Sequence, residues 1–163
     1  MNELKTTPGG YDRLHQLLID TRTRFYEVCQ DNEDANGSGD SSVWHDNFAY
    51  EENQRQMQAL STKVIQLERL LADMSVDTIP VVEPKTVILG SLVTVMMNER
   101  KRTFFICGHQ DGDIAHERIS YDSPLGRVLM GLEVEDEVTI RLGGKSVDVE
   151  ILSIGISNTP EHN

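Results

Sequence analysis

The chain has 163 residues, of which 38% are hydrophobic and 26% charged, so it is long enough for two small folded domains. Its 27 acidic residues outnumber 15 Lys and Arg, and the formal net charge of -12 makes it a poor candidate for wrapping nucleic acid. We therefore expect a partner that presents a positive surface, a metal ion or both.

Nothing in the sequence predicts export or membrane insertion. Residues 1–10 are polar and lack the apolar core of a signal peptide. The longest apolar stretch, residues 87–97, is interrupted by polar residues and is too short to span a bilayer. Cys29 and Cys107 form neither a CxxC pair nor a disulfide framework. We expect a reduced, cytoplasmic protein.

Two apolar stripes in the first half have the alternating spacing of three and four residues that is typical of a coiled coil. They comprise Tyr11, Leu14, Leu18, Thr21, Phe25 and Val28, and then Met57, Leu60, Val64, Leu67, Leu71 and Met74. The turn signal Asn36–Gly39, within residues 31–42, predicts that the two helices form an antiparallel hairpin. Thr7 and Pro8 provide a cap and a first-turn proline for the first helix. We assign residues 1–79 to this hairpin, with an acidic tip at about 31–46.

The pattern changes to short strands after a linker at residues 80–84. The predicted strands are β-branched or alternating runs at residues 86–89, 92–96, 103–107, 137–141 and 146–152. Residues 98–101 and the pair Gly143-Gly144 stand where hairpin turns belong. Residues 123–131 predict one short helix, capped by Ser123. The sequence thus predicts an α+β fold, in which residues 85–163 form a curled antiparallel sheet around one helix.

Several segments match a known family in order and separation. They are Thr7–Leu14, Leu89–Val95, Phe105–Gly108, Ile119-Ser120 and Ser123–Gly131. The last segment, a Ser-Pro helix closed by glycine, is the most specific. Together, over nearly the whole chain, they resemble the bacterial Gre (GreA/GreB-like) transcript-cleavage and elongation factors.

The resemblance implies a fold and a partner. The fold is a two-helix coiled-coil hairpin followed by an FKBP-like domain. The partner is bacterial RNA polymerase, on which the C-terminal domain docks at the rim of the secondary channel while the hairpin enters it. Ser123, Pro124, Leu125 and Gly126 are the implied docking residues. The chain would be a monomer when free, would approach the 3′ end of the nascent RNA indirectly, and would not be an enzyme itself.

The resemblance also implies two acidic residues at the hairpin tip. In the family the first follows a glycine, and the second stands three positions later, before an asparagine. Asp46 matches the second, but Val43 stands three residues before it. Asp40 follows Gly39, yet lies six positions before Asp46. Asp46 and Asp40 are therefore the implied catalytic and metal-binding residues, for a Mg²⁺ ion shared with the polymerase. Either an insertion displaced Asp40, or the first acid is absent.

The surroundings of the tip favour a role with a metal ion. Residues 25–54 contain eight acidic residues and no Lys or Arg. The alternative is a solvated charge run at the end of a hairpin. We interpret Trp44 as a cap on the coiled coil and His45 as a surface residue. Residues 34–39 imitate the start of a calcium loop, but His45 stands where a bidentate Glu is required, which argues against a calcium site.

Four further polar residues in the second half could suggest a metal site: His109, Asp111, Asp113 and His116. Their spacing matches no ligand pattern, so we interpret them as a polar loop. The leading functional hypothesis is an elongation factor that stimulates cleavage of backtracked RNA. The alternatives are a non-catalytic Gre-like regulator that occupies the channel, which the valine at position 43 favours, and a coiled-coil adaptor unrelated to polymerase.

Overall fold

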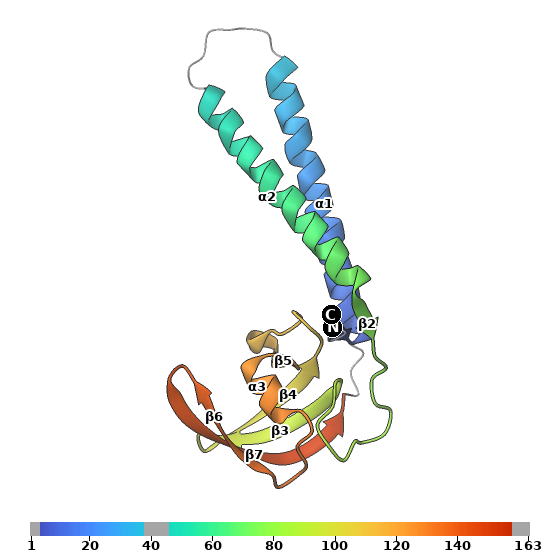
Figure 1. The fold of residues 1–163 in the computed structure, drawn as a ribbon, viewed down its shortest axis with the longest axis vertical. Coiled ribbons are helices and arrows are strands. Elements are labelled where there is room, and N and C mark those ends of the chain that lie inside the picture. The colour runs from blue at the N-terminus through green and yellow to red at the C-terminus, as the bar shows by residue number, and fades with distance from the viewer. Residues whose placement is uncertain (1–3, 38–45, 158–163) are drawn as a thin grey trace. The chain divides into compact units, whose positions relative to one another are not determined.

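The computed structural model describes residues 4–37 and 46–157. Its contacts divide the chain into two compact units, one of Leu14–Asp73 and the other of Met1–Arg13 with Met74–Asn163. Figure 1 shows the helices of the first unit and the sheet of the second. Neither long helix, over its described residues, is apolar enough to cross a membrane.

The helical unit is built on the predicted apolar stripes. α1 spans Pro8–Gly37 and α2 spans Asp46–Ala72, and the two run antiparallel, side by side (Figure 1). On α1 the buried positions of the stripe are Leu14, Leu18, Thr21 and Val28, and on α2 they are Leu67 and Leu71. The buried Thr21 hydroxyl donates to the Leu17 carbonyl oxygen at 2.6 Å, which satisfies it within its own helix. The predicted seam is confirmed at these positions.

α1 extends through the acidic residues that follow the first apolar stripe and ends at Gly37, within the predicted turn signal Asn36–Gly39. Acidic residues are tolerated in a helix, whereas glycine is a frequent helix end. One detail of the predicted hairpin is wrong: Met74 does not end the second stripe, because it begins strand β2 (Met74–Val76).

A short parallel pair of strands, which the sequence analysis did not predict, joins the chain's beginning to the end of the hairpin. β1 (Leu4–Thr6) pairs with β2, and Leu4 lies opposite Met74. The segment also binds the sheet domain, because the His109 amide donates to the Lys5 carbonyl oxygen at 2.9 Å. Residues 1–13 and 74–79, assigned to the hairpin from sequence, thus belong to the unit that contains the sheet.

The remaining strands form one five-stranded sheet of order β5-β4-β3-β7-β6. The strands are β3 (Ser91–Met97), β4 (Arg100–Cys107), β5 (Arg118–Ser120), β6 (Glu137–Leu142) and β7 (Lys145–Ile156). All neighbours are antiparallel except β4 and β5. Helix α3 (Pro124–Leu129) lies over one face of the sheet (Figure 1), and a 3-10 turn, η1 (Ile114–His116), precedes β5. The predicted α+β fold is confirmed.

The core of this unit lies between the sheet and α3. Its fully buried side chains include Val87, Val93, Val95, Ile106, Leu129 and Ile151. Cys107 is also buried, and this burial raises the pKa of its thiol to about 12. The thiol is therefore an inert part of the core at neutral pH.

The two hairpin turns lie where the sequence predicted them, whereas one predicted strand does not form. Asn98 and Glu99 both have positive φ, as do Gly143 and Gly144, which is the backbone of tight two-residue hairpin turns. The strand predicted at residues 86–89 is wrong. There Val87 hydrogen-bonds Leu132 and Gly131 through its own backbone, and its side chain fills the core outside the sheet.

Candidate functional site

The first turn of α3 is held against strand β5 by the Ser-Pro-Leu-Gly segment. The Ser123 hydroxyl caps the helix by accepting a hydrogen bond from the Gly126 amide at 3.0 Å, and Pro124 takes the first helical position. Gly126 is buried, and a Cβ atom there would lie 2.0 Å from the Ser120 carbonyl oxygen. Only glycine therefore lets the helix approach β5 this closely.

A groove of about 580 Å³ opens beside this helix. Its apolar lining comes from Met97, Phe104, Ile114, Ile119, Pro124 and Leu125, and its charged or titratable lining from Arg102, His109, Arg118 and Asp122. Of the four docking residues predicted from the sequence, Ser123, Pro124 and Leu125 line the groove, and Gly126 supports it from the interior. An apolar hollow with a few polar groups is the usual form of a binding site.

One edge of the groove carries a hydrogen-bonded network around Asp122. His109 Nδ1 bonds one carboxylate oxygen of Asp122, and the Ser120 hydroxyl bonds the other. Burial raises the pKa of Asp122, but the hydrogen bonds from Ser120 and His109 outweigh that effect and lower it below its ordinary value. The carboxylate is thus held in its charged form beside α3.

The groove lining also contains two arginines, Arg102 and Arg118. Arg102 lies over the ring of Phe104, with its guanidinium carbon 5.1 Å from the ring centre. Arg118 Nη2 lies 3.7 Å from Asp113 Oδ2, which is too far for a hydrogen bond. Arg118 Nε is buried and has no hydrogen-bond partner within the described part of the chain.

The four polar residues considered as a metal cluster are distributed among separate partners. His109 binds Asp122, and Asp111 binds Arg13. Asp113 caps η1 and bonds His116 at 2.6 Å, and this hydrogen bond is the main cause that lowers the pKa of Asp113. Among residues 4–37 and 46–157, His, Cys, Asp and Glu side chains form no group of three that could hold a metal ion.

The family model for the GreA/GreB C-terminal region of transcription elongation factors matches residues 82–156. The transcription elongation factor GreA of Legionella pneumophila (strain Corby) is 30% identical over 146 residues, covering 88% of this chain and 88% of its own length.

The chain belongs to the GreA/GreB family of transcription elongation factors.

The GreA factor of Thermotoga neapolitana is similar as well, with 28% identity over 149 residues, covering 88% of this chain and 92% of the relative. Among solved structures, the crystal structure of Thermus aquaticus Gfh1 is 20% identical, covers 95% of this chain and 99% of its own, and has a TM-score of 0.45. The resemblance to Gre factors deduced from the sequence is thus confirmed, and the region matched by the family model includes the whole groove.

The family's tip motif falls mostly outside the structure. Asp40, Val43, Trp44 and His45 lie outside the described residues. Asp46 is the first residue of α2. The pairing of Asp40 with Asp46 therefore stays a prediction from the sequence.

Sequence reasoning missed the exposure of two aromatic side chains at the start of α2 and an acidic hollow on the sheet. Phe48 is 73% exposed and Tyr50 is exposed as well, both in the first turns of α2. Both residues lie outside the apolar stripe of the second helix. Their positions in the sequence pattern therefore already indicated exposed side chains.

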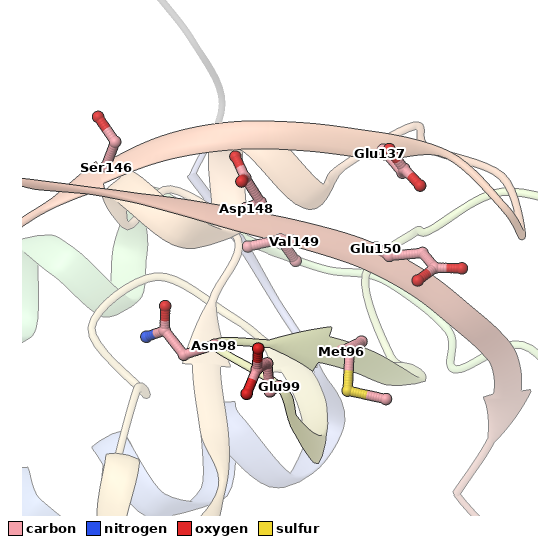
Figure 2. A pocket seen from close by; sticks show the side chains of 8 residues that line it. All are labelled: Met96, Asn98, Glu99, Glu137, Ser146, Asp148, Val149 and Glu150. Carbon is pink, nitrogen blue, oxygen red and sulfur yellow. The ribbon is translucent and has the colours of Figure 1, made fainter.

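The acidic hollow, of about 330 Å³, is lined by carboxylates that the alternating pattern of β6 and β7 places on one face. Figure 2 shows Glu137, Asp148 and Glu150 on these strands, with Asn98 and Glu99 at the β3–β4 turn. Glu137 and Glu150 are direct cross-strand partners, an unfavourable pairing of like charges.

Proposed function

We propose that this chain is a polymerase-binding elongation factor that stimulates cleavage of backtracked RNA by bacterial RNA polymerase. The C-terminal domain docks on the polymerase, and the hairpin enters the secondary channel. The observation that carries this proposal is an antiparallel two-helix arm, with Asp46 at the start of its second helix, in a chain of the GreA/GreB family. The chain itself is not the enzyme, because the polymerase's own active site cuts the RNA.

The groove beside α3 supports the docking half of the proposal. Pro124 and Leu125 present apolar surface there, next to the fixed side chains of His109 and Asp122. Protein interfaces are anchored by a few apolar or aromatic contacts with a polar rim. A helix end that is fixed by its cap and by Gly126 offers such a contact without a large cost in conformational entropy.

The acidic tip supports the cleavage half. Mg²⁺ prefers oxygen ligands, so Asp46 and Asp40 are suitable in chemistry to complete a site whose other ligands come from the polymerase. When bound, the ion would neutralise charge at the scissile phosphate. The aspartates of this chain would hold the attacking water in position and keep negative charge next to the ion. We assign the ion to the complex with the polymerase, which supplies its other ligands.

A second candidate function follows from the valine at position 43. If the first acid of the pair is absent, the arm would occupy the channel and inhibit or modulate transcription without stimulating cleavage. This regulator would use the same docking groove and the same arm, and would differ only in what its tip does.

The test is an RNA-cleavage assay with purified chain and stalled, backtracked elongation complexes, across a range of Mg²⁺ concentrations. Shortened RNA that appears only when the chain is added supports the cleavage factor. Slower ordinary elongation without shortened RNA supports the regulator. Failure to bind polymerase at all rejects both and leaves a coiled-coil adaptor.

A further inference from the structure

We propose that the free edge of strand β6 pairs with the same strand of a second copy of this chain, in an antiparallel register centred on Thr139. The homodimer joins the two sheets into one continuous sheet. It departs from the monomer that the resemblance to Gre factors implies for the free chain. The inference is independent of the proposed docking on polymerase, because β6 lies at the other edge of the sheet from β5, whose residues line the groove.

The backbone of β6 is open to pairing on one side. β6 ends the strand order β5-β4-β3-β7-β6, and β7 is its neighbour in the part of the chain that the structure describes (Figure 1). In an antiparallel pair, alternate residues direct their backbone groups toward the partner strand. The Ile151 amide donates to the Asp136 carbonyl oxygen at 2.9 Å, which places the even-numbered residues of this segment on the side of β7. The N–H and C=O groups of Glu137, Thr139 and Arg141 therefore face the free edge.

The side chains of these three residues make the edge complementary to itself. When β6 pairs with its copy about Thr139, Glu137 lies opposite Arg141 of the second copy, and Arg141 lies opposite Glu137 of the second copy. The same register brings together the residues whose backbone groups face the edge, so hydrogen bonds form in pairs along it. A register shifted by two residues keeps the backbone pairing but breaks both Glu137–Arg141 pairs. The charges therefore select one register.

Within one copy, neither charge stands directly across from its opposite. Glu137 lies opposite Glu150, and Arg141 lies opposite Ser146. Glu137 also lines the acidic hollow together with Asp148 and Glu150 (Figure 2). Like charges directly opposite each other destabilise a sheet, whereas opposite charges stabilise it. An arginine from a second copy thus brings positive charge to a place where the sheet itself has only carboxylates opposite each other.

The edge also lacks the usual protection against pairing. Natural proteins commonly protect an edge strand with lysine, proline or a β-bulge. Residues 137–142 contain neither lysine nor proline, and their register with β7 runs without a break. Ile140 is buried in the core, and Glu137, Thr139 and Arg141 are exposed. The sheet therefore holds β6 in an extended conformation in advance, which lowers the entropic cost of adding another strand.

Sedimentation velocity of the full chain at moderate salt, from micromolar concentration to about 1 mM, measures the association. We expect the wild-type mass to rise with concentration from 18.4 kDa toward twice that value. Glu137→Arg and Arg141→Glu each set like charges opposite each other, so each variant alone should dimerise at least about tenfold more weakly. An equimolar mixture of the two variants should regain the wild-type association, because each charge in the mixed dimer then meets its opposite.

Two further variants test the register and the backbone. Lys101→Glu, at an exposed position on β4, changes the net charge as Arg141→Glu does and should dimerise as the wild type does. Thr139→Pro removes the central backbone donor of the edge, where proline is tolerated because the N–H faces solvent in the monomer, and should prevent association.

Three results would overturn the inference. They are a wild-type chain that stays at 18.4 kDa up to about 1 mM, a dimer that withstands either single charge reversal, and a mixture that does not regain association. The first means that β6 binds no second copy, and the other two mean that the copies meet through another surface. None of them bears on the proposed function, which the polymerase assays test separately.

Discussion

Arg13 Nε and Nη2 donate to the two carboxylate oxygens of Asp111 at 2.7 and 2.6 Å, across 98 residues of sequence. The Asp111 side chain is 4% exposed and that of Arg13 is 25% exposed, so the pair is largely removed from water. Both residues belong to the unit that contains the sheet. The pair therefore fixes the first turns of α1 to the loop that follows β4.

We expect the loss of Arg13 and the loss of Asp111 to lower the free energy of unfolding by different amounts. Arg13→Ala leaves a carboxylate buried without its main partner and should lower the free energy of unfolding by about 3 kcal/mol. Asp111→Ala leaves the more exposed guanidinium, which water can reach, and should cost less. Urea unfolding followed by circular dichroism measures both. Equal losses, or a larger loss for Asp111→Ala, would contradict the assigned asymmetry.

Gly126 should not tolerate a side chain. A Cβ atom there meets the Ser120 carbonyl oxygen, a backbone atom that cannot rotate away, so Gly126→Ala should cost about 3 kcal/mol of stability. Gly155→Ala in β7 is the matched control, because a Cβ there meets nothing within 4 Å. Thermal unfolding of the two variants provides the comparison. If the two lose similar stability, the close approach of α3 to β5 is not the reason for this glycine.

The network around Asp122 predicts a dependence of stability on pH. The pKa of Asp122 is lowered in the folded state, because the hydrogen bonds from Ser120 and His109 outweigh the effect of burial. The stabilisation from this group is therefore present above the ordinary aspartate pKa of about 3.9 and is lost as the pH falls through the lowered value. Relative to Asp122→Asn, the wild type should be more stable at neutral pH, and the difference should shrink below about pH 4.

Thermal melts of both proteins from neutral to acidic pH measure this difference. A difference that stays constant over the whole range would mean that the Asp122 carboxylate contributes through its shape and hydrogen bonds alone, and not through its charge.

The tip predicts a separation of binding from cleavage. Asp46→Ala should reduce stimulated RNA cleavage by at least about tenfold, as expected for a lost metal-site residue, while polymerase binding stays nearly unchanged. Asp40→Ala tests whether the longer loop restores a second acid. Asp31→Ala, an exposed acidic position on α1, is the matched control and should retain cleavage.

Gel analysis of RNA from backtracked complexes, with binding measured in parallel, gives both quantities. Equal loss of binding and cleavage in Asp46→Ala would mean that Asp46 has a structural role. If Asp40→Ala behaves as the wild type while Asp46→Ala is inactive, Asp46 acts without the partner acid that the family's motif contains.

Local features of this protein could be predicted from the sequence because each depends on neighbours along the chain. The spacing of Leu14, Leu18 and Thr21 determines which face of α1 is buried, whatever packs against it. Asn98 with Glu99, and Gly143 with Gly144, form turns that need only two residues. The Ser123 cap reaches three residues ahead to Gly126. The order of such segments was also sufficient to identify the Gre family.

Tertiary structure alone decided the contacts between distant segments. The pairing of β1 with β2, the ion pair of Arg13 with Asp111, and the meeting of Arg102 with Arg118 in one groove depend on which residues the sheet brings together. No periodicity encodes these contacts, because each of them joins residues that are far apart in the sequence. The sequence thus determined the helices, the turns and the family, and folding determined the groove and its unsatisfied arginine, since burial and charge compensation exist only in three dimensions.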